Sequence, residues 1–170
     1  DLHSFPTRRS SDLVQRGQMR PLSQRIERAH LVIADSGVHG STREAVGALR
    51  RRYEEDTGTV GPLIGSLGAL TRTAIAALND GDAPALGAAM NRAHAVLAEL
   101  GLSLPILDGL TGAARRAGAL GAKLTGGGLG GCTIALADGP RAADRIRAEL
   151  ERAGAAATWT YRMRVSEADG

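Results

Sequence analysis

The run of residues 123–132 carries the clearest potential for chemistry in this chain, because it holds five glycines around one leucine. Glycine has no side chain to cover the backbone, and amides exposed at a tight turn can approach a phosphate closely. The residues expected beside a phosphate are Gly126, Gly127, Gly128, Gly130 and Gly131, with Lys123 as a nearby cation or as an outward-pointing strand residue. A glycine-rich hairpin kept only for close packing is the alternative interpretation.

Two phosphate-binding patterns can be tested against this run. Gly126, Gly128 and Gly131 have the spacing G-x-G-x-x-G, which binds dinucleotides when a strand precedes the loop and a helix follows it. Here the apolar residues 133–137 follow instead and end at turn residues 138–140, which predicts a strand. No Lys-Ser or Lys-Thr pair follows the glycines, so the P-loop pattern fails as well. We therefore expect a turn between two strands.

A second candidate lies at residues 41–44, where Ser-Thr-Arg-Glu forms a capping box that predicts the start of a helix. The free amides at such a start carry partial positive charge and favour anions. Ser41 and Thr42 are therefore candidates for contact on the substrate side, with Ser41 acting only as the N-cap as the alternative. The β-rich residues 31–34 precede this start, and Asp35 is expected to serve in the turn or as a cap.

Hydrophobic periodicity places these motifs in an α+β fold. The pattern predicts a mostly antiparallel four-stranded sheet with about five helices packed on it. Residues 157–165 alternate between apolar and polar types, which predicts a strand with one face toward water. The predicted strands are 31–34, 122–125, 133–137 and 157–165, and the predicted helices are about 41–58, 60–78, 82–100, 105–116 and 140–153.

Composition excludes several other classes of protein. The net charge of +3 comes from basic residues interleaved with acidic ones, and the chain has four aromatic residues, so we expect no nucleic-acid partner. Arg50–Arg52 are interpreted as a solvated helix face. No apolar stretch is expected to reach membrane-spanning length. His30, His39 and His94 lack metal-binding spacing, so we expect no metal site, and the single Cys132 is expected to be a buried apolar residue in a cytoplasmic protein.

The two motifs together resemble the C-terminal half of the GHMP small-molecule kinases, and within that superfamily the mevalonate kinases. Residues 123–136 resemble the third motif of the family, a glycine-rich turn beside the phosphoryl-transfer centre. Residues 31–38, followed by 41–46, resemble the strand and helix start that open the C-terminal domain. The resemblance implies a ferredoxin-like GHMP kinase C-terminal domain. Because a Cβ would block approach to the amides, we expect valine at Gly128 to abolish activity in the full-length enzyme and to leave most of the fold.

The resemblance also implies a division of the chain. Residues 1–13 differ in texture and are interpreted as a non-native leader, 14–30 as a remnant of the N-terminal domain or linker, 31–165 as the C-terminal domain, and 166–170 as a tail. The family's catalytic aspartate, its partner lysine and its ATP loop lie in earlier sequence, and nothing here matches them. We therefore expect no catalytic residue in this fragment, no cofactor bound by it alone, and no activity of its own.

The activity that the resemblance implies is transfer of phosphate from ATP, with Mg²⁺ as cofactor, to mevalonate in isoprenoid biosynthesis, giving 5-phosphomevalonate. The alternatives are a galactokinase-like or phosphomevalonate kinase, or a non-catalytic module that binds small molecules. The expected partners are mevalonate and ATP, bound through the missing N-terminal half, with a homodimer as a further possibility. An exposed apolar strip is expected near the glycine turn and residues 31–34, where that half would pack.

Overall fold

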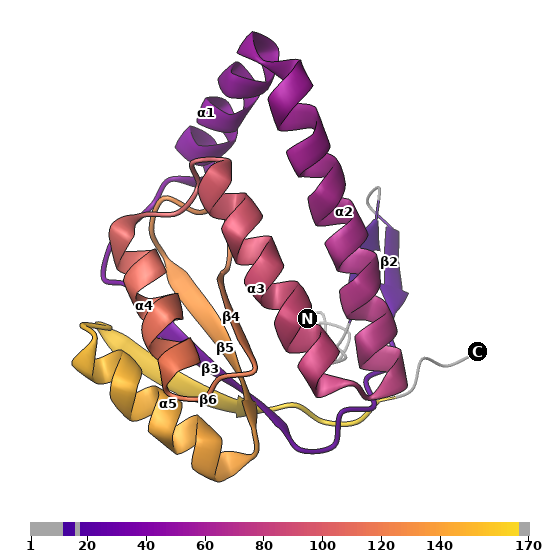
Figure 1. Ribbon diagram of the computed structural model, residues 1–170, viewed down its shortest axis with the longest axis vertical. Helices are drawn as coiled ribbons and strands as arrows, with labels where there is room; N and C mark the ends of the chain where they lie inside the picture. The colour runs from indigo at the N-terminus through magenta and orange to yellow at the C-terminus, as the bar shows by residue number, and fades with distance from the viewer. Residues whose placement is uncertain (1–11, 16–17, 167–170) are drawn as a thin grey trace, which may run out of the picture.

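The computed structural model describes residues 12–15 and 18–166, which form an α+β fold around one antiparallel sheet (Figure 1). Its strand order is β4-β5-β3-β6, so β5 and β3 are central and β4 and β6 are edges. These strands are β3 (Ala29–Asp35), β4 (Gly121–Leu124), β5 (Cys132–Asp138) and β6 (Ala157–Arg162). The predicted fold class is confirmed.

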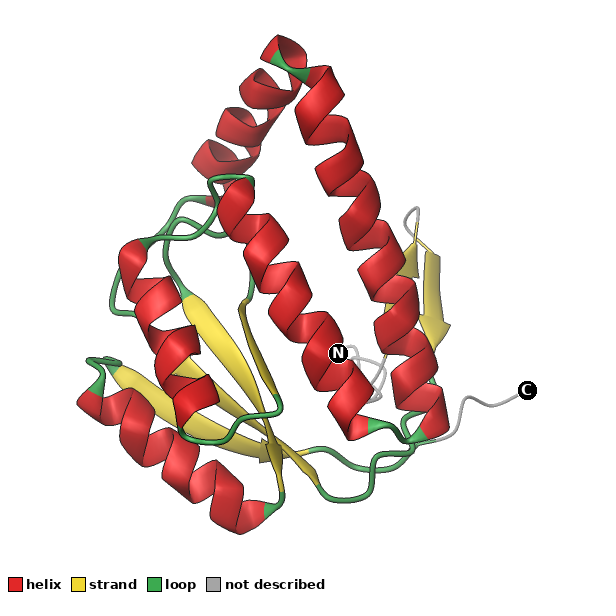
Figure 2. Cartoon of the chain, viewed as in Figure 1, coloured by secondary structure: helices red, strands yellow, loops and turns green. Residues whose placement is uncertain are grey.

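Five helices accompany the sheet, as predicted (Figure 2). Their bounds are α1 (Thr42–Glu55), α2 (Thr57–Asp80), α3 (Ala83–Glu99), α4 (Pro105–Arg116) and α5 (Pro140–Arg152). The boundary between the first two lies at Asp56, slightly before the expected one. Asp56 accepts a hydrogen bond at 3.0 Å from the Thr59 amide, so it caps α2 immediately after α1 ends.

Helices α4 and α5 cover one face of the sheet, where they form a fully buried core. The close approach of helix and sheet is possible because the strands contribute small residues to this face. The buried members are Val32, Ala34, Leu110, Ala114, Ala122, Ala135, Ala137, Ala142, Ala143, Ile146 and Leu150. A second cluster joins α2 and α3 to the sheet through Ile26, Ala29, Ala77, Leu86, Met90 and Leu136.

The edge strand β6 corrects one expectation about faces. Trp159 and Tyr161 belong to its predicted dry side, yet they are 52% and 44% exposed. They pair with Ile33 and Leu31 of β3, on the face of the sheet opposite α4 and α5. The expected exposed apolar strip therefore lies on β6, beside residues 31–34, which are themselves buried or half-buried.

Residues before β3 take part in the same packed unit. Ile26 is buried in the second cluster, and the buried Gln24 side chain donates to the carbonyls of Ile26 and Arg164 at 3.1 Å each. The backbone of Gln24 also pairs with Ser166. Residues 24 and 26 therefore pack with the sheet, and the domain start at residue 31 stays a prediction.

A separate two-stranded hairpin, β1 (Asp12–Gln15) with β2 (Gln18–Pro21), precedes this unit. The predicted leader overlaps the first two residues of β1, and its remainder, residues 1–11, lies outside the described residues. Most of the predicted tail, residues 167–170, also lies outside them. Assignment of the leader and of a remnant from another domain stays a prediction.

Helix α2 is the one helix in the described part of the chain that is long and apolar enough, by length and composition, to cross a membrane. No such stretch was expected from the sequence. Alanine, leucine and isoleucine raise the mean hydropathy of an 18-residue window to 1.2, and 17% of that window is buried. Because α2 packs along α3 within the second cluster, its composition alone is weak evidence for a membrane.

Candidate active site

The glycine turn and the segment before α1 leave the same end of the sheet. Asp35, the last residue of β3, pairs with Cys132, the first residue of β5. Residues 36–41 and 125–131 therefore emerge side by side. The Ser36 amide donates to the Gly131 carbonyl at 3.0 Å, and the Gly131 amide donates to the Val38 carbonyl at 2.7 Å. The predicted turn between two strands is confirmed, and these bonds join it to the approach to α1.

A third segment, between α3 and α4, supports the tip of the turn. The Leu129 amide donates to the Leu102 carbonyl at 2.8 Å, and Leu129 adopts a positive φ of 56°. Its side chain packs on the cluster of Ala45, Val60, Leu100 and Leu102. The single leucine among the glycines is therefore an apolar anchor that fixes the turn to the helices.

Two glycines of the turn are required by packing. A Cβ at Gly128 would lie 2.4 Å from the Leu102 carbonyl oxygen, and one at Gly130 would lie 2.5 Å from the Val38 oxygen. Both glycines are buried and have positive φ values of 84° and 129°. In this half of the turn the amides of Leu129 and Gly131 are also occupied, whereas those of Gly128 and Gly130 donate to no other described residue. Uncovered amides throughout the turn are therefore not found, and packing alone accounts for the glycines at positions 128 and 130.

The first half of the turn is more exposed than the second. The amides of Gly126 and Gly127 donate no hydrogen bond to another described residue, and Gly126 is exposed. A Cβ on Gly127 would lie 3.2 Å from the Thr42 Cα and from its Oγ1. The structure therefore brings together Gly127 and Thr42, two candidates that are far apart in the sequence.

The start of α1 contributes further free donors at this point. Ser41 is the N-cap, and its Oγ accepts a hydrogen bond from the Glu44 amide at 3.3 Å, as predicted. The amides of Thr42 and Arg43 donate to no other described residue. Since the N-terminus of a helix carries about half a positive charge, this end of α1 and the first half of the glycine turn form one anion-attracting surface.

Lys123 does not belong to that surface. Its ammonium donates to the Leu124 carbonyl at 2.7 Å and lines a cavity of about 280 Å³ between α2, α3 and β4. The other lining residues carry no charge; they are Leu67, Leu70, Thr71, Ala74, Ala89, Met90, Ala93 and Leu97. Burial lowers the pKa of Lys123 from its ordinary value. The structure places this cation away from the glycines.

The sequence analysis missed the role of Asn91, which lies on α3 and binds the edge of β4. Its amide nitrogen donates to the Leu120 carbonyl at 3.3 Å, and its Oδ1 accepts from the Ala122 amide at 2.9 Å. Asn91 thereby makes two hydrogen bonds to this edge of the kind that a neighbouring strand would make. An asparagine in an apolar helical stripe is a signal that could have pointed to this role.

Other predicted features have plain structural roles. Arg50 forms an exposed ion pair with Glu54 at 2.8 Å, which confirms the solvated face, whereas Arg52 donates to the Glu99 carbonyl at the end of α3. Cys132 is half-buried, and its thiol pKa is raised by burial and by Asp35. Among the described residues, no group of three or more His, Cys, Asp or Glu side chains could hold a metal ion.

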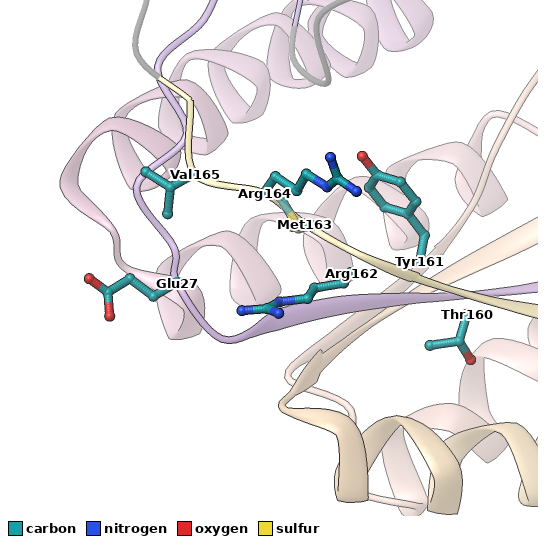
Figure 3. Close-up of a pocket in the computed structure, with 7 residues that line it drawn as sticks. All are labelled: Glu27, Thr160, Tyr161, Arg162, Met163, Arg164 and Val165. Atoms are coloured by element: carbon teal, nitrogen blue, oxygen red, sulfur yellow. The ribbon is translucent and has the colours of Figure 1, made fainter.

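A larger hollow of about 880 Å³ lies at the other end of the sheet (Figure 3). It is lined by Glu27 and by residues 160–165. Arg162 pairs with His30, at the end of β3 opposite the glycine turn. None of the candidate residues lines this hollow, so its size does not make it the site of chemistry.

Comparison with known proteins identifies the family of this domain. Residues 74–156 match the family described as GHMP kinases C terminal, and this range contains the glycine turn. A structure of mevalonate kinase from L. major in complex with R-mevalonate superposes with a TM-score of 0.85 and 28% identity, covering 92% of this chain and 49% of that one. The chain therefore contains a GHMP kinase C-terminal domain.

Within that family, mevalonate kinases are similar to this chain in sequence. The protein from Pyrococcus abyssi is 45% identical over 114 residues, covering 64% of this chain and 34% of that protein. The protein from Thermococcus sibiricus is 40% identical over 129 residues, covering 73% of this chain and 38% of that protein. The chain thus matches about a third of the length of these relatives.

Proposed function

We propose that this chain provides the C-terminal domain of an ATP-dependent mevalonate kinase of the cytoplasm. In this reaction the 5-hydroxyl oxygen of mevalonate bonds to the γ-phosphorus of ATP, the bond to ADP breaks, and the hydroxyl loses its proton. Sequence identity to mevalonate kinases supports the choice of substrate over the other GHMP kinases. The observation that carries the proposal is the contact between Gly127 and Thr42, which places two sets of free amides together.

The domain's own part in this reaction is electrostatic. Phosphoryl transfer depends on positioning and on stabilising negative charge that spreads over the phosphate oxygens. The amides of Gly126 and Gly127, with those of Thr42 and Arg43, donate toward an anion at this surface. Thr42 Oγ1 adds a hydroxyl beside Gly127. Lys123 is not assigned a phosphate contact, because its ammonium lies in the apolar cavity.

Mg²⁺ and a group that accepts the hydroxyl proton are the remaining needs of such a kinase. The described residues offer no set of carboxylates at the glycine turn, so they do not fit a magnesium site. No step is therefore assigned to a metal held by this domain. We place these groups in the two thirds of the relatives' length that the chain does not match, and we propose that the chain alone is inactive.

The experiment compares turnover of mevalonate, phosphomevalonate and galactose by the complete gene product, with the present chain as a second sample. ADP formation is expected with mevalonate in the complete protein and with no substrate in the chain alone. Preference for galactose or phosphomevalonate would move the assignment to another GHMP kinase. Binding of a small molecule without ADP formation from any of the three would favour the non-catalytic module.

A substitution tests the surface itself. Gly127→Ala places a methyl group between the free amides and Thr42, and we expect kcat/KM to fall about tenfold to hundredfold, since small displacements of positioning groups cost this much. Gly65→Ala is the matched control, because its Cβ on α2 would meet nothing within 4 Å. Equal kcat/KM in both variants would contradict a role for Gly127 in phosphoryl transfer.

A further inference from the structure

A buried histidine on α3 contacts the strand that leads into the glycine turn. His94 Nδ1 accepts a hydrogen bond from the Leu124 amide at 3.2 Å, and Leu124 is the last residue of β4 before the turn. The side chain is almost fully buried. A backbone N–H can only donate, so Nδ1 must be unprotonated and the hydrogen-bond network assigns the proton to Nε2.

The other side of the ring contacts a carboxylate. His94 Nε2 lies 3.0 Å from Asp108 Oδ1 and 3.0 Å from Thr111 Oγ1. Thr111 donates its own proton to the Asp108 carbonyl at 3.1 Å, so its oxygen is free to accept. Nε2–H thus donates toward Asp108 and Thr111, which fixes both the orientation and the tautomer of the ring.

Asp108 also reaches the segment under the tip of the turn. Ser103 Oγ donates to the same Asp108 Oδ1 at 2.6 Å. Ser103 follows Leu102, whose carbonyl accepts the Leu129 amide and lies where a Cβ on Gly128 would collide. The Asp108 carboxylate therefore contacts both groups that support the turn. His94 binds the start of the turn at Leu124, and Ser103 follows Leu102, whose carbonyl binds the tip.

We propose that His94 and Asp108 are positioning residues that hold the glycine turn in the geometry needed for phosphoryl transfer. They touch neither substrate nor phosphate and act through Leu124 and Leu102. This role rests on the proposed function. It goes beyond it by assigning a purpose to a buried polar network on α3 and α4.

The network should also respond to acid. A protonated His94 would present a second N–H to the Leu124 amide, so the bond at the start of the turn would be lost. The charged groups that act on the ring are Asp108 and Arg115 from α4 and Lys123 from β4. Burial lowers the pKa of His94, while Asp108 opposes this effect. The neutral ring, and with it the support, therefore persists at neutral pH.

Two substitutions separate the two sides of the ring. His94→Asn places its Oδ1 near the position of Nδ1 and retains an acceptor for Leu124, whereas His94→Gln places its amide nitrogen near Nε2 and loses that acceptor. Amide hydrogen exchange of the present chain, measured by NMR, reads this directly. We expect Leu124 to exchange about three to ten times faster in His94→Gln, as for loss of one hydrogen bond, and within twofold of wild type in His94→Asn.

Asp108→Ala should accelerate exchange at both Leu124 and Leu129, because it releases both supports. Gly109→Ala is the control for a general change in α4, since Gly109 follows Asp108 in the helix and its Cβ would meet nothing within 4 Å. It should leave both amides within twofold of wild type. Unchanged exchange at Leu124 in His94→Gln, or equal changes in all four variants, would overturn the proposal.

Kinetics of the complete kinase test the consequence for catalysis. We expect His94→Gln to lower kcat about tenfold with KM for the acceptor within twofold, and His94→Asn to restore most of kcat and remove the acid limb of the wild-type pH profile. Altered exchange with unchanged kcat would overturn the positioning role. If the wild-type protein phosphorylates no substrate, the proposed function fails, and the exchange data still decide whether His94 and Asp108 hold the turn.

Discussion

The two halves of the glycine turn contain the same residue type for different physical reasons. Gly128 and Gly130 are buried against the carbonyls of Leu102 and Val38, where no Cβ fits. Gly126 has open space around its missing Cβ, and the three atoms nearest to a Cβ on Gly127 belong to Thr42. Residues 128–131 thus form a rigid half of the turn, which we call the seat, and residues 126–127 form an open half with free amides.

This difference shows how a phosphate-binding turn can be both open and well positioned. Free amides have value for catalysis only if they need no reorganisation during the reaction. The bonds from Leu129 to Leu102 and from Gly131 to Val38 provide that rigidity. The amides of Leu129 and Gly131 are occupied by these bonds and cannot bind a ligand. They therefore hold the free amides of Gly126 and Gly127 in place.

The largest effect should come from Gly128→Ala. The new Cβ would lie 2.4 Å from a backbone oxygen at a positive φ, so both a steric collision and a left-handed conformation must be accommodated. We expect the free energy of unfolding to fall by about 3 kcal/mol, as for overpacked sites with added backbone strain. Urea unfolding measures it, and a loss below about 1 kcal/mol would contradict the rigid seat.

This expectation differs from the sequence-based one, in which valine at Gly128 leaves most of the fold, because a Cβ there would meet the Leu102 carbonyl oxygen. The sequence supplied the five helices, the four strands and the turn between β4 and β5, because apolar periodicity and turn residues are local signals. It could not divide the turn into halves, since Leu102 and Val38 are remote in sequence. His94 and Asn91 were visible as polar residues on an apolar helix, but their partners on β4 and α4 depend on tertiary packing.

Gly126→Ala separates strain from collision. Its φ of 82° matches that of Gly128, yet its Cβ would meet nothing within 4 Å. We expect a loss of about 1 to 2 kcal/mol, the cost of a left-handed conformation for a residue with a Cβ. Urea unfolding beside Gly128→Ala checks the difference between them. Equal losses in the two variants would mean that strain alone, and not the seat on Leu102, distinguishes the halves.

Acid should lower the free energy of unfolding by less than the substitutions at Gly128 and Gly126. Because burial lowers the pKa of His94 in the folded protein, the unfolded chain binds more protons below its ordinary value of about 6.5. Stability is therefore fully present above that pH and falls as the pH drops toward the folded-state pKa. Asp108 offsets part of the burial, so the change should be smaller than for either glycine.

The measurement for this effect is the urea midpoint between pH 7.5 and pH 5.5, with His94→Asn as the control that removes the titrating ring. The wild-type midpoint should fall with acid by more than that of the variant. Parallel curves for the two proteins would show that His94 does not contribute to the acid response, and that the start of the turn is held by other contacts.

The smallest effect on stability is expected for Gly127→Ala, although we expect this substitution to lower kcat/KM. The φ of Gly127 lies outside the left-handed region, and the nearest atoms to its Cβ belong to Thr42 at 3.2 to 3.3 Å. Thr42 is exposed at the start of α1, so it can shift by a few tenths of an ångström. We expect the free energy of unfolding to change by less than about 0.5 kcal/mol, as for other surface substitutions. A loss as large as that of Gly128→Ala would erase the distinction between the halves, because the open amides would then also be part of the seat.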